Sequence, residues 1–284
     1  MFVDSNRPIV GFPKEWDSFL QRHPSWPTVL RNLHQILEKV FIRDVALGSQ
    51  SEKIIFFMGR LCVEDFNEIF LLAANGYGFG SLKILRGLYE RVVTMAYISE
   101  NQDEVTNFLE YHYIHKGKLL HHAESFFSNL EDYIDKVEIE EAKSDFRKYK
   151  DRFMQTNCKN CNTKRLMNSW SKLDLASMAK KTGMESLYFP GYYYPTIQAH
   201  ATTASVIYRL KSSESNPVSF DEGSQPDVAD KSLIIAHNLA IHIVYIQNEF
   251  FNLNLKKEID LLTADYKVIW GGSANNEESL KEKV

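Results

Sequence analysis

The sequence predicts an all-α protein: a single helical bundle with an additional N-terminal helical arm and a polar C-terminal tail. Three observations support this class. Apolar residues recur at helical spacing along most of the 284 residues, strand-like alternation is scarce, and only thirteen glycines and eight prolines interrupt the pattern. Fourteen tyrosines and eighteen phenylalanines are enough to build a thick aromatic interior.

Helical periodicity, taken in chain order, defines nine segments. The stretch "NGYGFGS" at 75–81 breaks the chain between the third and fourth segments. A turn-rich polar loop, "SSESNPVSFDEGSQPD" at 212–227, precedes the last segment, and "GGSANNEESLKEKV" at 271–284 has too little apolar surface to order itself. We expect helices at about 14–21, 27–47, 52–75, 78–99, 103–128, 136–155, 166–182, 194–212 and 228–254.

These patterns predict three regions. Residues 1–50 form the N-terminal arm, and residues 51–256 form the bundle core. The core carries a basic insertion at about 142–182 and the polar loop at about 212–227. Residues 257–284 form a C-terminal extension, of which the last 14 or so residues are expected to be flexible.

Cysteine usage and hydropathy indicate a cytoplasmic protein without a membrane segment. Three cysteines are an odd set, whereas secreted proteins more often carry an even number. The first residues have no long apolar run of the kind that a signal peptide requires. The longest apolar stretch, "LIIAHNLAIHIVYI" at 233–246, is shorter than the roughly 20 residues that span a bilayer.

Charge is concentrated in one segment although the formal net charge of the chain is −4. Residues 142–182 contain eleven basic and three acidic residues, interleaved with aromatic residues. This segment could attract the phosphates of a nucleic acid, or it could be a solvated helix pair whose aromatic rings face inward. If it binds RNA, the candidate contacts are Arg147, Lys159, Lys164 and Arg165.

The same segment contains "CKNC" at 158–161, a lone CxxC motif. No second cysteine pair lies nearby, so a structural zinc site would need histidines from elsewhere in the chain. A zinc site, a redox pair and an ordinary loop therefore all stay open.

Two charged residues are expected on the apolar face of the helix at 78–99. Arg86 and Glu90 are four residues apart, and both share a face with Phe79, Leu82, Val93 and Tyr97. Because burying a lone charge costs several kcal/mol, the two side chains are expected to pair. The pair could fix the register of the helix, or it could be a charged centre in a cleft.

Histidines gather on the helix at 103–128, where "YHYIHKGKLLHHAE" spans 111–124. On this helix His112 and His115 are expected to face inward, and on later helices His200 and His237 are too. If the protein holds a metal, the expected ligands are His112, His115 and His200. A ferritin-like di-iron site is not indicated, because the sequence contains no Glu-x-x-His motif. We expect no cofactor.

The stretches "LLAANGYGFGSLKILRGLYERVVTMAYI" and "YYYPTIQAHATTAS" resemble an uncharacterised group of bacterial helical proteins with an Arg-x-x-x-Glu helix and a later Tyr…His helix. That group is similar to the HEPN superfamily, over residues 52–254 in outline. Active members of the superfamily are metal-independent ribonucleases of phage-defence and toxin systems, and others are RNA-binding or dimerising modules. The resemblance implies a HEPN-like bundle, a homodimer, and RNA, a cognate antitoxin or another protein as partner.

Active HEPN ribonucleases carry an arginine, four to six intervening residues and then a histidine on one helix. This spacing does not occur here, so a catalytic pair must come from two helices, and Arg86 and His200 are the natural candidates. Cleavage by the 2′-hydroxyl needs a base, for which His200 or His112 is suited, and a cation for the phosphate, for which Arg86 is suited. Glu90 would orient Arg86 or a histidine, and Tyr194 could donate a hydrogen bond.

Three functions stay open on the sequence alone. The first is a HEPN-like ribonuclease or RNA-binding protein. The second is a non-catalytic helical module that binds a partner protein and uses the Arg86–Glu90 pair only as a strut. The third is a small-molecule or metal site in the bundle, either hydrolytic or sensory.

Overall fold

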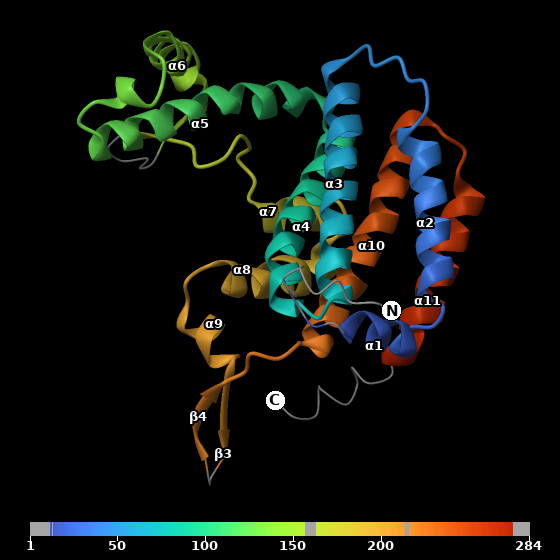
Figure 1. Ribbon diagram of the computed structural model, residues 1–284. Coiled ribbons are helices and arrows are strands. Elements are labelled where there is room, and N and C mark those ends of the chain that lie inside the picture. The colour runs from blue at the N-terminus through green and yellow to red at the C-terminus, as the bar shows by residue number, and fades with distance from the viewer. Residues whose placement is uncertain (1–11, 13, 157–162, 214–215, 275–284) are drawn as a thin grey trace. The chain divides into compact units, whose positions relative to one another are not determined.

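A computed structural model describes residues 12, 14–156, 163–213 and 216–274 (Figure 1). Helices dominate these residues, and the strands among them form two short antiparallel hairpins, which confirms the predicted all-α class. The α-helices are α1 (Glu15–Arg22), α2 (Trp26–Phe41), α3 (Gln50–Ala74), α4 (Gly78–Glu100), α5 (Val105–Phe126), α6 (Lys136–Tyr149), α7 (Leu175–Lys181), α8 (Tyr194–Ala199), α9 (Thr203–Ile207), α10 (Pro226–Phe251) and α11 (Lys256–Ala274).

Short elements fill the connections between these helices. The 3₁₀ turns are η1 (Gln102–Glu104), η2 (Leu130–Asp132), η3 (Lys150–Phe153) and η4 (Glu185–Leu187), and η5 (Phe189–Tyr193) is a π-helix. The hairpins pair β1 (Met154–Thr156) with β2 (Lys164–Leu166) and β3 (Leu210–Ser213) with β4 (Asn216–Phe220). Within the described residues, no helix combines the length and apolar character needed to cross a bilayer.

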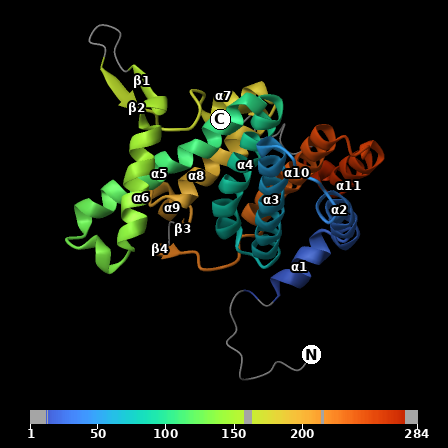
Figure 2. The ribbon, with the colours of Figure 1, turned by 90° about the horizontal axis from the view of Figure 1, so that it is seen from above.

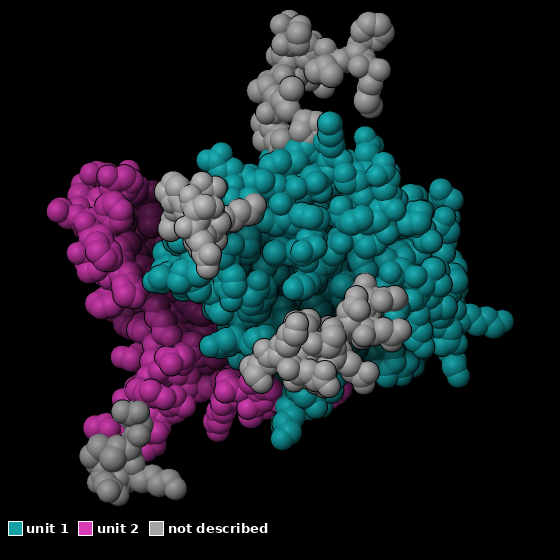
Figure 3. Space-filling view, turned by 90° about the horizontal axis from the view of Figure 1, so that it is seen from below, with its two compact units in different colours: residues 1–99, 178–284 teal, residues 100–177 magenta. Residues whose placement is uncertain are grey.

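The chain forms two compact units, shown in different colours in Figure 3. Unit 1 consists of residues 1–99 and 178–284, and unit 2 consists of residues 100–177. These positions differ from the divisions at 50 and 256 that the sequence suggested, and those divisions stay predictions about domain organisation. The expected flexible end of the C-terminal extension includes 275–284, which lies outside the described residues.

Helices α3 and α10 form the centre of unit 1, and Figures 1 and 2 both place α2 and α4 beside α3. The start of α3 is fixed by a capping box, in which Ser49 Oγ accepts from the Glu52 amide and the Glu52 carboxylate accepts from the Ser49 amide. Farther along α3, a Cβ at Gly59 would lie 2.6 Å from Nε2 of Gln247 on α10. The absent side chain therefore permits the close approach of the two helices.

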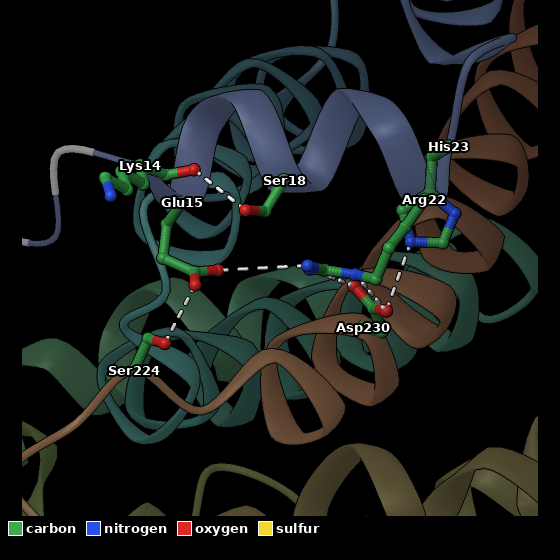
Figure 4. Close-up of polar contacts among 7 residues, drawn as sticks. All are labelled: Lys14, Glu15, Ser18, Arg22, His23, Ser224 and Asp230. Carbon is green, nitrogen blue, oxygen red and sulfur yellow. Dashed lines mark hydrogen bonds and ion pairs between the residues drawn. The ribbon is translucent and has the colours of Figure 1, made fainter.

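A polar cluster joins α1 to the start of α10 (Figure 4). Asp230 on α10 accepts from Arg22 Nε at 3.4 Å, and one of its carboxylate oxygens lies 3.1 Å from His23 Nε2. The carboxylate of Glu15 lies 3.8 Å from an Arg22 nitrogen and also accepts from Ser224 Oγ at 2.9 Å. The cluster thus ties residues about 200 positions apart to each other.

Unit 2 is built around α5 and α6, which pack against each other. Its core has two clusters, one of Tyr111, Ile114, Phe153 and Met167 and one of Leu120, Leu130, Ile139 and Ala142. The buried side of α5 is therefore the face of Tyr111, Ile114 and Leu120. Leu119 and Phe126 lie outside this buried face, and 70% and 81% of their surfaces are exposed.

The structure corrects four helix predictions and adds a helix. The expected helix at 27–47 ends at Phe41, and the helix at 136–155 ends at Tyr149. The expected helix at 194–212 is two helices followed by β3, and the helix at 166–182 begins only at Leu175. Helix α11 was not predicted. Asn252 and Asn254 adopt left-handed φ angles of 53° and 57°, so the chain turns after α10 and a new helix follows.

Candidate functional site

Helix α4 presents three residues of one turn region, Arg86, Tyr89 and Glu90, to the segment that contains η4, η5 and α8. Tyr89 is fully buried, and its hydroxyl donates to the carbonyl oxygen of Met184 at 3.0 Å. Its ring lies 6.2 Å from the ring of Tyr188 and 6.2 Å from that of Tyr192. Burial raises the pKa of Tyr89, which keeps the phenol protonated and able to donate. Tyr89 therefore anchors the η5 turn against α4.

The guanidinium of Arg86 is the centre of the candidate site. Nη1 lies 3.0 Å from Nε2 of His200, and Nη2 lies 3.2 Å from Oε1 of Glu90. The ring of Tyr192 lies under the guanidinium, with 5.2 Å between Cζ and the ring centroid. The structure thus brings together Arg86, Glu90 and His200, three residues that the sequence had predicted to share a site.

The contact with Arg86 defines the protonation state of His200 in this arrangement. A guanidinium carries only donors, so Nε2 of His200 must accept the hydrogen bond. The imidazole is therefore neutral, and its proton lies on Nδ1. A neutral imidazole 3.0 Å from a cation is a base held next to a group that binds phosphate oxygens.

His200 lies at the surface and not in the interior, so the predicted inward orientation is wrong. It follows the last residue of α8, with an extended ψ of 157°, and is exposed. The helix stops here because Thr202 caps α9: its hydroxyl oxygen accepts from the amide of Ser205. The Arg86–Glu90 pair is also less buried than predicted, with 27% and 41% of the two side chains exposed.

Two aromatic features of the site were not predicted. The sequence favoured Tyr194, but the described contact of its ring is with Tyr208, and it is Tyr192 that packs on Arg86. Phe189 and Tyr193 are stacked at 5.7 Å with 24° between their planes, and 63% and 53% of their surfaces are exposed. The "FPGYYYP" sequence indicates that several aromatic rings lie close together. It does not reveal the π-helical turn η5, which determines which of these rings packs on Arg86 and which is exposed.

The histidines of α5 do not face a core. His112 and His115 are both exposed, so the inward orientation predicted for them is wrong. The error came from assigning the apolar face one residue away from Tyr111 and Ile114, the pair that is buried. Desolvation, the largest cause, lowers the pKa of His115. Both residues belong to unit 2, and they are not part of the Arg86–His200 contact.

No metal-binding group is assembled in the described part of the chain. Among those residues, no three His, Cys, Asp or Glu side chains gather as metal ligands, and this applies to the alternative set of His112, His115 and His200. The CxxC motif and Lys159 lie outside the described residues. Of the other candidate RNA contacts, Arg147, Lys164 and Arg165 are all exposed on unit 2.

Comparison with known protein families gives a match over more than half of the chain. A family model described as "Family of unknown function (DUF5677)" matches residues 52–217, a range that contains Arg86, Glu90 and His200. No curated protein and no solved structure matches the chain.

Proposed function

Because the chain belongs to this family of unknown function, we propose its activity from its own side chains: a metal-independent, HEPN-like ribonuclease whose centre is the Arg86–His200 contact. The observation that carries the proposal is the 3.0 Å distance between Nη1 of Arg86 and Nε2 of His200. This contact pairs an arginine, the residue type best suited to binding the phosphodiester, with a histidine. Histidine is the residue type best suited to removing the proton of the neighbouring ribose 2′-hydroxyl. Glu90 fixes the guanidinium from the other side.

The proposed reaction begins with the exchange of one hydrogen bond. Arg86 Nη1 stops donating to Nε2 of His200 and donates to a phosphate oxygen of the RNA instead, so the lone pair on Nε2 becomes free. Nε2 then removes the proton of the 2′-hydroxyl, the 2′-oxygen attacks phosphorus, and the bond from phosphorus to the 5′-oxygen breaks. The products are a 2′,3′-cyclic phosphate and a 5′-hydroxyl, whose oxygen takes a proton from water. Arg86 stabilises the charge that develops on the phosphorane.

Other residues of the chain would hold the strand. The exposed rings of Phe189 and Tyr193 offer faces on which unpaired bases can stack. Burial, and after it the neighbouring Tyr208, raises the pKa of Tyr194, so its phenol stays protonated and could donate a hydrogen bond. Arg147, Lys159, Lys164 and Arg165 would attract phosphates. By the HEPN resemblance, the proposal includes a phage-defence or toxin role in the cytoplasm, a homodimer and an antitoxin partner.

A second candidate function is favoured by the contacts that already hold Arg86, although within the described residues its buried Nε has no hydrogen-bond partner. Nη1, Nη2 and the face of the guanidinium all have partners inside unit 1, as a strut between α4 and α8 would require. In that case the protein is a non-catalytic module that binds a partner protein.

Cleavage of labelled single-stranded RNA in EDTA separates the two functions. We expect cleavage by the wild type and a loss of about 100-fold or more in Arg86→Gln and in His200→Gln, the range typical of removing a general base or an electrostatic contact. The Phe189→Ala/Tyr193→Ala double variant should weaken RNA binding and leave the rate at saturating RNA unchanged.

Lys83→Gln is the matched control, because Lys83 is an exposed cation on the same helix. If no RNA is cleaved by the wild type, or if Arg86→Gln cleaves as fast as Lys83→Gln, the ribonuclease proposal is wrong. If the protein binds RNA without cleaving it, and Arg86→Gln and His200→Gln do not change this binding, the role of Arg86 is that of a strut between α4 and α8.

A further inference from the structure

Unit 2 contains a cleft of about 520 Å³ between α5 and α6, whose lining shares only Arg147 with the residues proposed to attract RNA. Its size falls within the range of small-molecule pockets, roughly 300–1,000 Å³. The floor is apolar and consists of Gly117, Leu120, Phe146 and Leu166. A ligand that fills this cleft therefore needs an apolar body.

The floor depends on Gly117. A Cβ at this position would lie 2.3 Å from Cδ2 of Phe146, closer than real Cβ contacts come. The absent side chain lets the phenyl ring lie directly on the backbone of α5. Phe146 therefore forms part of the floor of the cleft. A larger residue at position 117 would occupy the space that the phenyl ring now fills.

The rim of the cleft is cationic. Lys118, Lys143 and Arg147 line it together with His121, and Glu124 is the carboxylate among the lining residues. Glu124 is already neutralised, because Lys143 Nζ lies 3.0 Å from its Oε1. Lys118 is also engaged, since its ammonium donates to Tyr111 Oη at 2.9 Å and to the carbonyl oxygen of Met167 at 3.0 Å.

Two groups on the rim keep donors for a ligand. Arg147 donates from Nε to the carbonyl oxygen of Lys143 at 3.2 Å, and within the described residues its two Nη groups have no acceptor. The ring of His121, on the opposite helix, likewise has no partner in the described part of the chain. A guanidinium fork with both Nη groups available matches the two oxygens of a carboxylate.

We propose that this cleft binds a small amphipathic carboxylate, with the carboxylate on Arg147 and His121 and an acyl or aryl body over Leu120 and Phe146. The inference concerns unit 2 alone and does not rest on the proposed ribonuclease activity. It gives Arg147 a role different from the RNA contact for which its charge had made it a candidate.

The test is a calorimetric titration of the full chain with decanoate, kept below the concentration at which micelles form. We expect saturable binding of one decanoate per chain. Acetate, which lacks the apolar body, and decyltrimethylammonium, which carries the opposite charge, should bind at least about tenfold more weakly. Hydrogen exchange should slow at 117–124 and 143–147 when decanoate is bound.

Arg147→Gln should weaken decanoate binding at least about tenfold, the size of a lost charge-assisted hydrogen bond. Lys148→Gln removes a charge from the next position of α6, outside the lining of the cleft, and should bind as the wild type does. The proposal is overturned if decanoate does not bind, if decyltrimethylammonium binds as tightly, or if the two variants behave alike. It is also overturned if Arg147→Gln weakens RNA binding and leaves decanoate binding unchanged.

Discussion

His237 is a fully buried titratable group of unit 1 that the site does not use. It lies on α10 with none of its surface exposed, between the rings of Trp26, Tyr266 and Trp270. Trp270 Nε1 donates to its Nδ1 at 3.1 Å, so the ring proton is on Nε2. Within the described residues Nε2 has no hydrogen-bond partner. The site is therefore built for the neutral imidazole.

Protonation of His237 should couple folding to pH. Burial lowers its pKa from 6.5 to about 4, so between these values the unfolded chain binds a proton that the folded chain does not. The free energy of unfolding should therefore fall as the pH falls from 6.5 to 4, by about 3 kcal/mol in total. Urea unfolding at pH 7, 5.5 and 4 measures this loss.

The contribution of His237 is isolated by comparison with His237→Asn, which keeps an acceptor near Nδ1 and does not titrate. The difference in stability between wild type and variant should shrink or reverse as the pH falls through this window. His122→Asn removes an exposed histidine and should follow the wild type at each pH. Parallel curves for wild type and His237→Asn would show that His237 is not the source of the pH dependence.

At the scale of residues, the sequence predicted the partners better than their burial. The pairing of Arg86 with Glu90 was predicted because a lone charge on an apolar face needs a partner, and Arg86 and His200 were placed together by the HEPN resemblance. The exposure of His200 did not follow, because it depends on whether Thr202 caps a new helix or continues the old one. Hydrogen bonds from a threonine side chain to the nearby backbone compete with the backbone hydrogen bonds of a helix. The spacing of apolar residues carries no information about them.

Among the elements, α3 and α10 depend on one glycine for their close approach. Gly59→Ala would place its Cβ 2.6 Å from Gln247 Nε2 and 2.8 Å from Phe41 Cζ. Gln247 is buried and donates to the Ile55 carbonyl oxygen at 2.7 Å, so it cannot retreat without losing that bond. We expect Gly59→Ala to lower the free energy of unfolding by about 1–3 kcal/mol, as overpacking does. Thermal and urea unfolding measure the effect.

Gly87→Ala is the matched control on α4. Its added Cβ would meet only the end of the flexible Arg91 side chain, at 3.2 Å. Alanine is the better helix former by roughly 1 kcal/mol, so this variant should be as stable as the wild type or more stable. A Gly59→Ala protein as stable as Gly87→Ala would mean that α3 and α10 have room to separate.

The helices were predictable where a long amphipathic segment determines the local structure. Examples are α1 to α5 and α10, whose ends mostly agree with the expected segments to within a few residues. Prediction failed where short polar interactions decide. The hairpin of β1 and β2 and the broken helix at 194–212 are examples. In each, a few hydrogen bonds override a weak helical pattern that continues in the sequence.

At the scale of the whole molecule, the division into two units follows from contacts that no local pattern contains. Unit 2 has its own core, in which Tyr111 and Ile114 of α5 meet Phe153 and Met167. Residues 1–99 and 178–284 are far apart in sequence but share unit 1, because α3 packs on α10 and α1 is tied to Asp230. Apolar periodicity finds helices but does not say which of them share a core.

Separate cores predict separate loss of structure. Ile114 is fully buried in unit 2, and Ile114→Ala should cost about 2–5 kcal/mol through the cavity that it leaves. Because its packing partners all belong to unit 2, hydrogen exchange should accelerate in residues 100–177 and change little in the described parts of 1–99 and 178–274. Ile243→Ala, at a fully buried position of α10, should give the reverse pattern. If either substitution accelerated exchange equally in both units, the two cores would be one cooperative structure and the proposed independence of the unit 2 cleft would be lost.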